Sequence, residues 1–191
     1  MTARRGAAVR SAVLLAALDE LVDHGYAALT IDNVAQRARV HKTTVYRRWP
    51  DRESLLTDAV LEQASADFAL PDTGSVDEDL AAGLRGLADW LAGPVGAPLV
   101  AMLASDAARL PAMAEAKRRF FAARGEVLAG RLATAIAAGQ FPADTDPGTF
   151  LGVLVAPLYF SLVVLDIPVS HADCDRAAAV ALHAARAGLL R

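Results

Sequence analysis

Apolar residues recur at intervals of three and four along most of this chain, which is the spacing of amphipathic helices. In residues 7–24 the pattern includes Val9, Val13 and Leu21, and Gly25 follows where a helix end favours left-handed backbone. The same spacing predicts further helices at residues 31–38, 42–48, 52–63, 76–92, 97–108, 112–138, 147–165 and 172–190. The sequence shows no strand pattern and no internal repeat, so we expect an all-α fold of about nine helices.

The second and third predicted helices are short, and residues 39–41 separate them. Thr30 is positioned to cap the first of the two, and Pro50 ends the second. Two short helices joined by a tight turn and braced by a longer preceding helix form a helix-turn-helix. We therefore expect a three-helix domain with a helix-turn-helix at residues 1–50 and a helical bundle at residues 51–191.

The chain is strongly apolar, with 54% hydrophobic residues and a mean hydropathy of +0.32, which excludes a disordered chain. Much of the excess is alanine, 43 of 191 residues, which favours helices. The 19 uncharged residues at 147–165 approach the length that spans a bilayer. Pro157 in the middle and acidic Asp146 and Asp166 at the ends favour a buried helix and no membrane, with a transmembrane helix as the alternative.

The net charge of −3 conceals an asymmetry along the chain. Residues 1–50 carry eight basic and four acidic residues, whereas residues 51–191 carry 11 basic and 18 acidic residues. A basic unit joined to an acidic one indicates a polyanion-binding head, although chance drift of surface charge is the alternative. Arg4, Arg5 and Arg10 at its start form either a phosphate-seeking or minor-groove arm or a disordered tail.

A dense set of residues in the first 56 positions carries a family resemblance. The set comprises Ala17, Leu21, His24, Gly25, Tyr26, Thr30, Val34, Ala35, Ala38, Thr44, Val45, Tyr46, Arg47, Trp49, Pro50, Glu53, Ser54, Leu55 and Leu56. This segment resembles the DNA-binding domain of TetR-family transcriptional regulators. Two positions depart from the family: Arg39 replaces the usual turn glycine, and His41 replaces the usual capping serine or threonine. If position 39 needs positive φ, arginine costs about 1 kcal/mol relative to glycine there.

The resemblance and the side-chain chemistry together indicate a DNA-binding surface. A recognition helix presents its first residues to base edges, where Thr43 suits a thymine methyl and Arg47 suits guanine. Tyr46 and Arg52 are expected at phosphates, with packing beneath the helix as the alternative for Tyr46, and Trp49 is expected to pack. The expected DNA-binding residues are Thr30, Arg39, His41, Lys42, Thr43, Thr44, Tyr46, Arg47 and Arg52.

The rest of the chain resembles, more loosely, the ligand-sensing and dimerising domain of the same family, through residues 71–74 and 157–160. Helices 147–165 and 172–190 are expected to form a four-helix bundle with a second copy, unless 147–165 is simply the core helix of the monomer. The expected dimer residues are Leu151, Val155, Leu158, Tyr159, Leu162, Ala178, Leu182 and Ala185. An apolar ligand pocket, or plain core, is expected at Trp90, Met102, Leu103, Phe120, Phe121 and Phe150.

The sequence holds no motif typical of an enzyme, and we expect neither catalysis nor a cofactor. His171, Asp173, Cys174 and Asp175 are metal-ligand types, but they begin a predicted helix where aspartates serve as caps, so no metal is expected. The single cysteine and the lack of a signal-peptide pattern favour the cytoplasm.

These observations predict a bacterial transcriptional repressor that binds a palindromic double-stranded operator as a homodimer and is released by a small apolar or amphipathic ligand. An activator, or a regulator without a ligand, is the alternative within the same class. A helical binding module or an enzyme that reuses the head without DNA is the alternative from another class.

Overall fold

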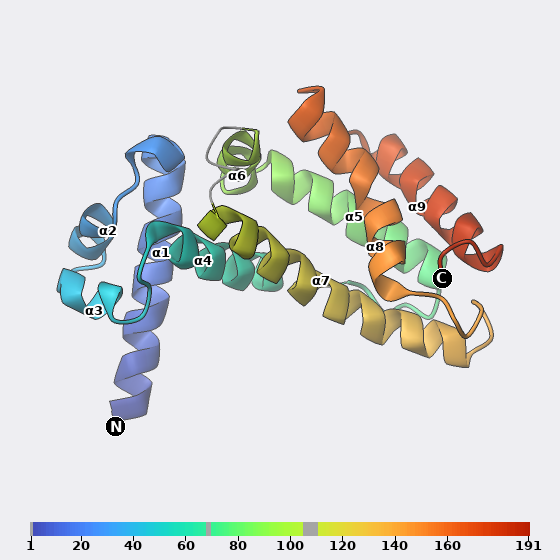
Figure 1. Ribbon diagram of the computed structural model, residues 1–191, viewed down its shortest axis with the longest axis horizontal. Coiled ribbons are helices and arrows are strands. Elements are labelled where there is room, and N and C mark those ends of the chain that lie inside the picture. The colour runs from blue at the N-terminus through green and yellow to red at the C-terminus, as the bar shows by residue number, and fades with distance from the viewer. Residues whose placement is uncertain (1, 68–69, 105–110) are drawn as a thin grey trace. The chain divides into compact units, whose positions relative to one another are not determined.

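The computed structural model describes residues 2–67, 70–104 and 111–191, and within these ranges the chain is helical without strands (Figure 1). The all-α prediction is confirmed. The helices are α1 (Thr2–Ala28), α2 (Ile31–Arg37), α3 (Lys42–Tyr46), α4 (Arg52–Asp67), α5 (Val76–Ala92), α6 (Gly96–Leu103), α7 (Pro111–Ala137), α8 (Pro147–Tyr159), the π-helical turn η2 (Phe160–Val164) and α9 (His171–Arg186).

Most helix ends lie at the residues that the local sequence indicates. Gly25 has φ 73° and breaks the regular part of α1, as expected for a helix-ending glycine. Thr30 accepts a hydrogen bond from the Asn33 amide at 3.1 Å, which confirms it as the cap of α2. The last helix ends at Arg186, earlier than expected, because the chain turns through Gly188 at φ 70°.

The predicted helix 147–165 is divided. Pro157 has no amide hydrogen, so it cannot complete the α-helical hydrogen bond in the turn before it. Three residues further on, the backbone widens into η2, where the Leu165 amide donates to the carbonyl of Phe160 at 3.1 Å. The wider turn changes which side chains of this segment face the rest of the chain.

The chain forms two compact units. The first comprises residues 1–66 and 93–120, and its buried side chains include Leu18 and Leu21 of α1 and Val34 of α2. This unit therefore contains α4, α6 and the start of α7 in addition to the segment expected at residues 1–50.

The second unit comprises residues 67–92 and 121–191, and in it α9 packs against both α5 and α8. Small buried residues such as Ala178 and Ala181 allow these helices to approach closely. Phe150 is fully buried and meets Phe141 edge to face, with 6.1 Å between the ring centroids.

A buried ion pair braces the second unit. The carboxylate of Asp79, in the first turn of α5, is fully buried. It accepts hydrogen bonds from the Thr73 hydroxyl at 2.7 Å, from the Thr73 amide at 3.1 Å and from the guanidinium of Arg131 on α7. These hydrogen bonds link the loop that precedes α5 with helix α7.

Three aspartates in this unit have lowered pKa values. Burial by itself raises the pKa of Asp79, but the hydrogen bonds from Arg131 and Thr73 outweigh burial and lower it. The hydroxyl and amide of Thr149 lower the pKa of Asp146, the cap of α8. The corresponding groups of Ser170 lower the pKa of Asp173.

We therefore expect acid to destabilise the protein in a defined pH window. These ionised carboxylates stabilise the folded state fully above the unfolded aspartate pKa of about 3.9, and the contribution is lost as the pH falls through their lower folded values. Denaturant unfolding should show a steep loss of free energy of unfolding below about pH 4. Asp146→Asn keeps a capping oxygen without the charge, so its slope there should be shallower. An unchanged slope would contradict the assignment of Asp146.

Candidate nucleic-acid interface

The two helices of the helix-turn-helix are joined by a turn under backbone strain. Arg39 takes φ 55°, a left-handed conformation that favours glycine. Val40 then donates its amide to the carbonyl of Ala35 at 3.0 Å, which closes the end of α2. His41 precedes α3 in extended backbone, and its side chain accepts no hydrogen bond from the described amides of that helix. The departures at Arg39 and His41 therefore leave the turn intact.

The inner face of α3 is anchored in the first unit. Val45 is completely buried, and Trp49 is 3% exposed. The indole nitrogen of Trp49 donates to Asp58 of α4 at 3.0 Å. The prediction that Trp49 packs is confirmed, and the anchoring sets which side of α3 faces solvent.

The opposite face of α3 is exposed and polar. Tyr46 is 49% exposed, so the structure does not place it as a packing residue. Lys42 lies in solvent, where its ammonium pairs with Asp32 of α2 at 3.1 Å. Thr44 is half-buried. The other expected DNA-binding residues on this surface are also exposed: Thr30, Arg39, His41, Thr43 and Arg47.

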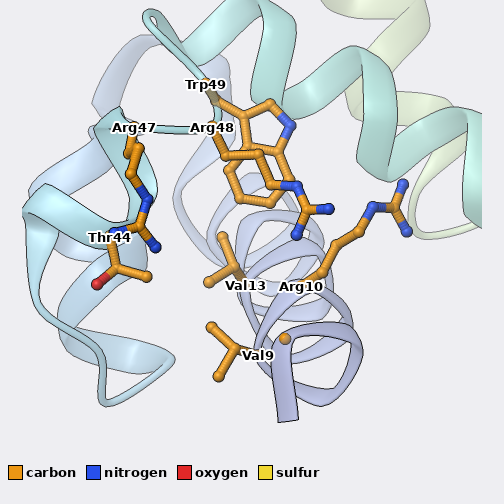
Figure 2. Close-up of a pocket in the computed structure, with 8 residues that line it drawn as sticks. Val9, Arg10, Val13, Thr44, Arg47, Arg48 and Trp49 are labelled. Carbon is orange, nitrogen blue, oxygen red and sulfur yellow. The ribbon is translucent and has the colours of Figure 1, made fainter. Parts of the chain in front are cut away.

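A groove of about 460 Å³ lies between the first half of α1 and α3 (Figure 2). Arg47 and Thr44 line it from the side of α3. Two further arginines also line it. Arg10, expected in a phosphate-seeking arm or a disordered tail, lies inside α1, and Arg48 after α3 is not among the expected DNA-binding residues. Arg48 follows directly after Arg47, so its position beside the recognition helix could be read from the sequence. The proximity of Arg10 to the same groove depends on how α1 packs.

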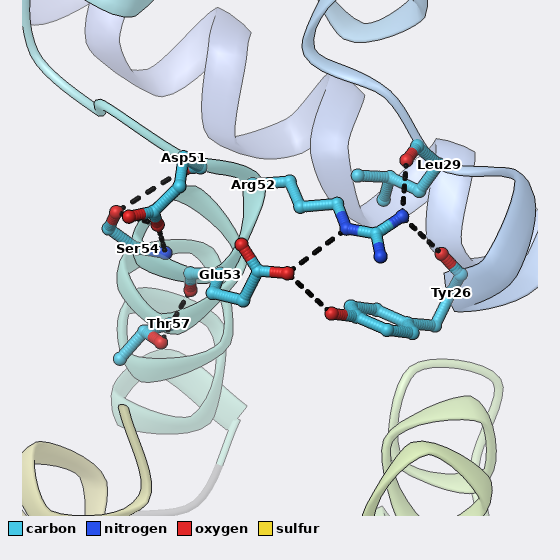
Figure 3. Close-up of polar contacts among 7 residues, drawn as sticks. All are labelled: Tyr26, Leu29, Asp51, Arg52, Glu53, Ser54 and Thr57. Atoms are coloured by element: carbon cyan, nitrogen blue, oxygen red, sulfur yellow. Dashed lines mark hydrogen bonds and ion pairs between the residues drawn. The ribbon is translucent and has the colours of Figure 1, made fainter. Parts of the chain in front are cut away.

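Arg52, which is expected at a phosphate, also makes contacts within its own chain (Figure 3). Its guanidinium donates to Glu53 at 3.1 Å and to the carbonyl of Leu29 at 3.2 Å, and it stacks 4.3 Å from the centroid of the Tyr26 ring. The Tyr26 hydroxyl donates to the same carboxylate at 2.6 Å. These contacts hold the connection between α1 and α2 against α4, and they leave a third of the Arg52 side chain exposed. The phosphate contact of Arg52 stays a prediction.

The Tyr26 hydroxyl is a stable donor in this network. Burial, followed by the hydrogen bond to Glu53, raises the pKa of Tyr26 to about 12. The hydroxyl therefore stays protonated at any physiological pH. Asp51 caps α4 by accepting a hydrogen bond from the Ser54 amide at 2.7 Å.

A second ion cluster, which the sequence did not indicate, fixes α2 on α1. Arg37 of α2 donates to Glu20 at 2.7 Å and to Asp23 at 2.8 Å, both on α1. Glu20 is 5% exposed, so this contact is largely shielded from water. Arg37 therefore stabilises the packing of α2 against α1 in the helix-turn-helix domain.

The expected ligand residues lie in different surroundings. Trp90 and Phe150 are buried, whereas Phe120 and Phe121 are half-buried. Phe121 meets Tyr159 edge to face, with 5.4 Å between the centroids. The side chains of two expected residues, Met102 and Leu103, lie outside the described part of the chain.

The expected dimer residues divide into two groups. Four are buried within the chain: Leu158, Ala178, Leu182 and Ala185. Four are half-buried: Leu151, Val155, Tyr159 and Leu162. More exposed apolar side chains lie nearby in the sequence, namely Phe160 (54%), Val164 (65%) and Val180 (58%).

The segment Pro147–Val164 is long and apolar enough to cross a membrane by length and composition, a property that core helices of soluble proteins share. In the described structure 22% of this segment is buried. Other apolar side chains of the segment are half-buried, and Phe160 and Val164 are more than half exposed.

The start of α9 is a capping structure. The Ser170 hydroxyl accepts from the Asp173 amide, and the Asp173 carboxylate accepts from the Ser170 amide at 3.0 Å. His171 pairs with Asp89 at 2.8 Å, and Cys174 is buried. Among the residues that the structure describes, no group of three such side chains is placed to hold a metal ion.

A helix-turn-helix with a buried inner face and an exposed, polar, basic outer face defines the class of DNA-binding regulators. Two family profiles agree with this class. The family model described as "Bacterial regulatory proteins, tetR family" matches residues 13–59. The model described as "Tetracyclin repressor-like, C-terminal domain" matches residues 70–181. The chain belongs to the TetR family of DNA-binding transcriptional regulators.

Individual relatives are similar over much of the chain. The crystal structure of the TetR family transcription regulator SCO0332 has a TM-score of 0.80 and 33% identity, and covers 92% of this chain and 97% of its own. The uncharacterized HTH-type regulator YdeS of Bacillus subtilis (strain 168) is 28% identical over 160 residues, 84% of this chain and 81% of YdeS. The DNA-binding transcriptional repressor TetR of Mycobacteroides abscessus is 43% identical over 75 residues, 38% of this chain and 40% of that protein. These relatives are transcriptional regulators.

Proposed function

We propose that the chain acts as a homodimer whose two α3 helices enter successive major grooves of a palindromic operator. The observation that carries this proposal is the polar outer face of α3 above the buried Val45 and Trp49. On this face Thr43 and Arg47 contact base edges, while His41, Lys42, Thr44 and Tyr46, together with Thr30 of the α2 cap, contact phosphates. The half-sites of the operator then lie about 34 Å apart.

The second copy is proposed to cover the exposed apolar side chains of η2 and α9. Phe160, Val164 and Val180 are each more than half exposed, and clusters of exposed apolar residues mark interaction surfaces. Two copies also double the number of phosphates that are neutralised, which tight binding at physiological salt needs.

We further propose that this cytoplasmic regulator is a repressor, released by a small apolar or amphipathic ligand bound in the body that the C-terminal profile covers. The Mycobacteroides abscessus relative is named as a repressor, which supports this direction of control. The aromatic side chains of Trp90, Phe121 and Phe150 supply apolar surface in the body. The ligand acts through a difference in its affinity for the DNA-bound and the released conformations.

Selection of duplexes from a random-sequence pool tests the proposal. We expect enrichment of a sequence with two-fold symmetry, followed by a gel shift of DNA upstream of this gene or its neighbours. A reporter gene under that operator should be expressed less when the protein is present. Failure to enrich any sequence at low or physiological salt would contradict the proposed function.

Arg39 gives a prediction in which stability and DNA binding change in opposite directions. Arg39→Gly should stabilise the fold by about 1 kcal/mol, because glycine adopts φ 55° without strain, and it should weaken DNA binding by removing an exposed cation. Arg39→Asn tolerates the same backbone without the charge and should weaken DNA binding equally. Thermal unfolding and fluorescence anisotropy measure the two effects. A glycine variant that binds DNA as tightly as the wild type would contradict the role of Arg39.

A further inference from the structure

The carboxylate of Asp58 on α4 connects the end of the helix-turn-helix with α7. One of its oxygens, Oδ2, accepts a hydrogen bond from the indole nitrogen of Trp49 at 3.0 Å. The other oxygen, Oδ1, accepts from the guanidinium of Arg119 on α7 at 2.7 Å. Asp58 and Arg119 are 61 positions apart in the chain, and both belong to the first unit. A single carboxylate thus links the residue that anchors α3 to a helix far away in the sequence.

The helix α3 depends on its anchoring side chains for its orientation. It has only five residues, and a helix of this length is not stable by itself in water. Its anchors include Val45, which is fully buried, and Trp49, whose amide donates to the carbonyl of Val45 at 2.9 Å. Because Trp49 is 3% exposed, water cannot easily replace the bond from its indole to Asp58. The position of the Asp58 carboxylate therefore affects the position of α3.

The orientation of this carboxylate depends in turn on Arg119. The Asp58 side chain is 25% exposed, so without Arg119 its carboxylate can rotate toward water. The hydrogen bond from Arg119 is charge-assisted, and such bonds are short and strong. Since the Arg119 side chain is 47% exposed, the ion pair adds little to the free energy of unfolding. Its main effect is on the geometry of the carboxylate.

We propose that Arg119 is a positioning residue for DNA binding, an inference that rests on the proposed function. Through Asp58 and Trp49, Arg119 fixes the orientation in which the outer face of α3 meets the major groove. It acts on the indole and makes no contact with DNA. Because α7 continues beyond Phe120 into the second unit, DNA affinity depends on a helix that both units share. A conformation of α7 that withdraws Arg119 from Asp58 lowers this affinity.

Neutral substitutions at the two ends of the ion pair test the proposal with opposite changes of charge. Arg119→Met and Asp58→Asn should each weaken binding to a selected duplex about 10-fold in fluorescence anisotropy, a typical coupling between distant sites. Asparagine replaces one of the two acceptor oxygens by an NH2 group, which cannot accept from either donor. Simple attraction to DNA predicts the opposite result for Asp58→Asn, namely stronger binding, because a negative charge is removed.

The neighbouring arginine on α7 supplies the matched control. Arg118 is 68% exposed and pairs with Glu115 of the same helix. Arg118→Met removes the same charge as Arg119→Met but leaves Asp58 untouched, so it should bind DNA as the wild type does. The indole N–H resonance of Trp49, assigned with Trp49→Phe, should shift in Arg119→Met and stay in place in Arg118→Met.

Two further measurements show whether Arg119 acts through Trp49. Trp49→Phe removes the indole donor, so Arg119→Met added to it should cause no further loss of affinity, whereas independent effects add. The slope of log K against log salt should be unchanged in Arg119→Met, because a lost phosphate contact in each half of a dimer would lower it by about 1.8. The midpoint of thermal unfolding should shift by no more than about 2 °C.

The possible failures are distinguishable. If the wild type prefers no duplex, the proposed function itself fails. If the wild type binds its selected duplex and Arg119→Met behaves like Arg118→Met, Arg119 does not position α3. A lower salt slope would make Arg119 a phosphate contact, and additive losses in the double variant would separate it from Trp49, so either result overturns the inference. A large fall in the thermal midpoint of Arg119→Met would assign the residue to the stability of the fold and contradict the positioning role.

Discussion

Phe160→Asp combined with Val164→Asp is expected to produce a monomer that binds the selected operator at least about 100-fold more weakly than the wild type. Both side chains are more than half exposed on η2. If a second copy covers them, each introduced carboxylate must lose its water on association, which is unfavourable without a partner charge. A monomer then presents one α3 to the DNA and neutralises half as many phosphates.

Sedimentation velocity gives the oligomeric state, and fluorescence anisotropy gives the affinity. Val127→Asp is the matched control, because Val127 on α7 is 54% exposed and apolar but is not part of the proposed interface. The control should remain dimeric and bind DNA normally. A double variant that stays dimeric with wild-type affinity would show that the second copy lies elsewhere.

Loss of the buried ion pair between Asp79 and Arg131 is expected to have the largest effect on stability. Asp79→Asn or Arg131→Met alone should lower the midpoint of thermal unfolding by about 10 °C, because each removes one charge of a buried pair. Among the described residues, Arg131 then keeps only the exposed Asp72 at 3.4 Å, and Asp79 keeps only its hydrogen bonds from Thr73. Asp79 is fully buried, and the Arg131 side chain is 12% exposed, so water compensates neither group. The double variant Asp79→Leu/Arg131→Met should recover much of the loss, because apolar residues replace both charges.

An exposed pair in the same unit supplies the control. Arg85 and Asp175 are 2.8 Å apart, but both side chains are more than a third exposed. Arg85→Met should shift the midpoint by no more than about 2 °C, since exposed pairs contribute little. Equal effects of Arg85→Met and Arg131→Met in calorimetry would show that burial does not set the strength of the Asp79 pair.

Local features of this protein follow from neighbouring residues and were predictable for that reason. Gly25 ends the regular part of α1, Thr30 caps α2 and Asp51 caps α4 through contacts within a few positions along the chain. The strain at Arg39 was indicated by the family resemblance, because glycine is usual at this position and Arg39 takes φ 55°. Trp49 was expected to pack because a large aromatic side chain ends the apolar face of α3.

Contacts between distant segments were not predictable in the same way. The sequence around Arg52, at the start of α4, suggests an exposed side chain. In the structure its guanidinium donates to the carbonyl of Leu29 and stacks on the Tyr26 ring. Arg10 and Arg48 meet in one groove although 38 positions separate them. Nothing in the spacing of either arginine indicates the other.

The apolar residues show which features of this protein the sequence pattern predicts and which features depend on tertiary packing. The apolar pattern by itself determined that the chain is helical, that residues 39–41 form a turn and that the segment 147–165 needs covering. It did not determine which side chains of that segment face inward, because η2 alters the helical repeat and α9 packs along one side. The chain itself covers Leu158, while Phe160 and Val164 are left to water or to a second copy. The apolar periodicity predicts which side chains tend to be buried, whereas tertiary packing decides which neighbouring residues bury them.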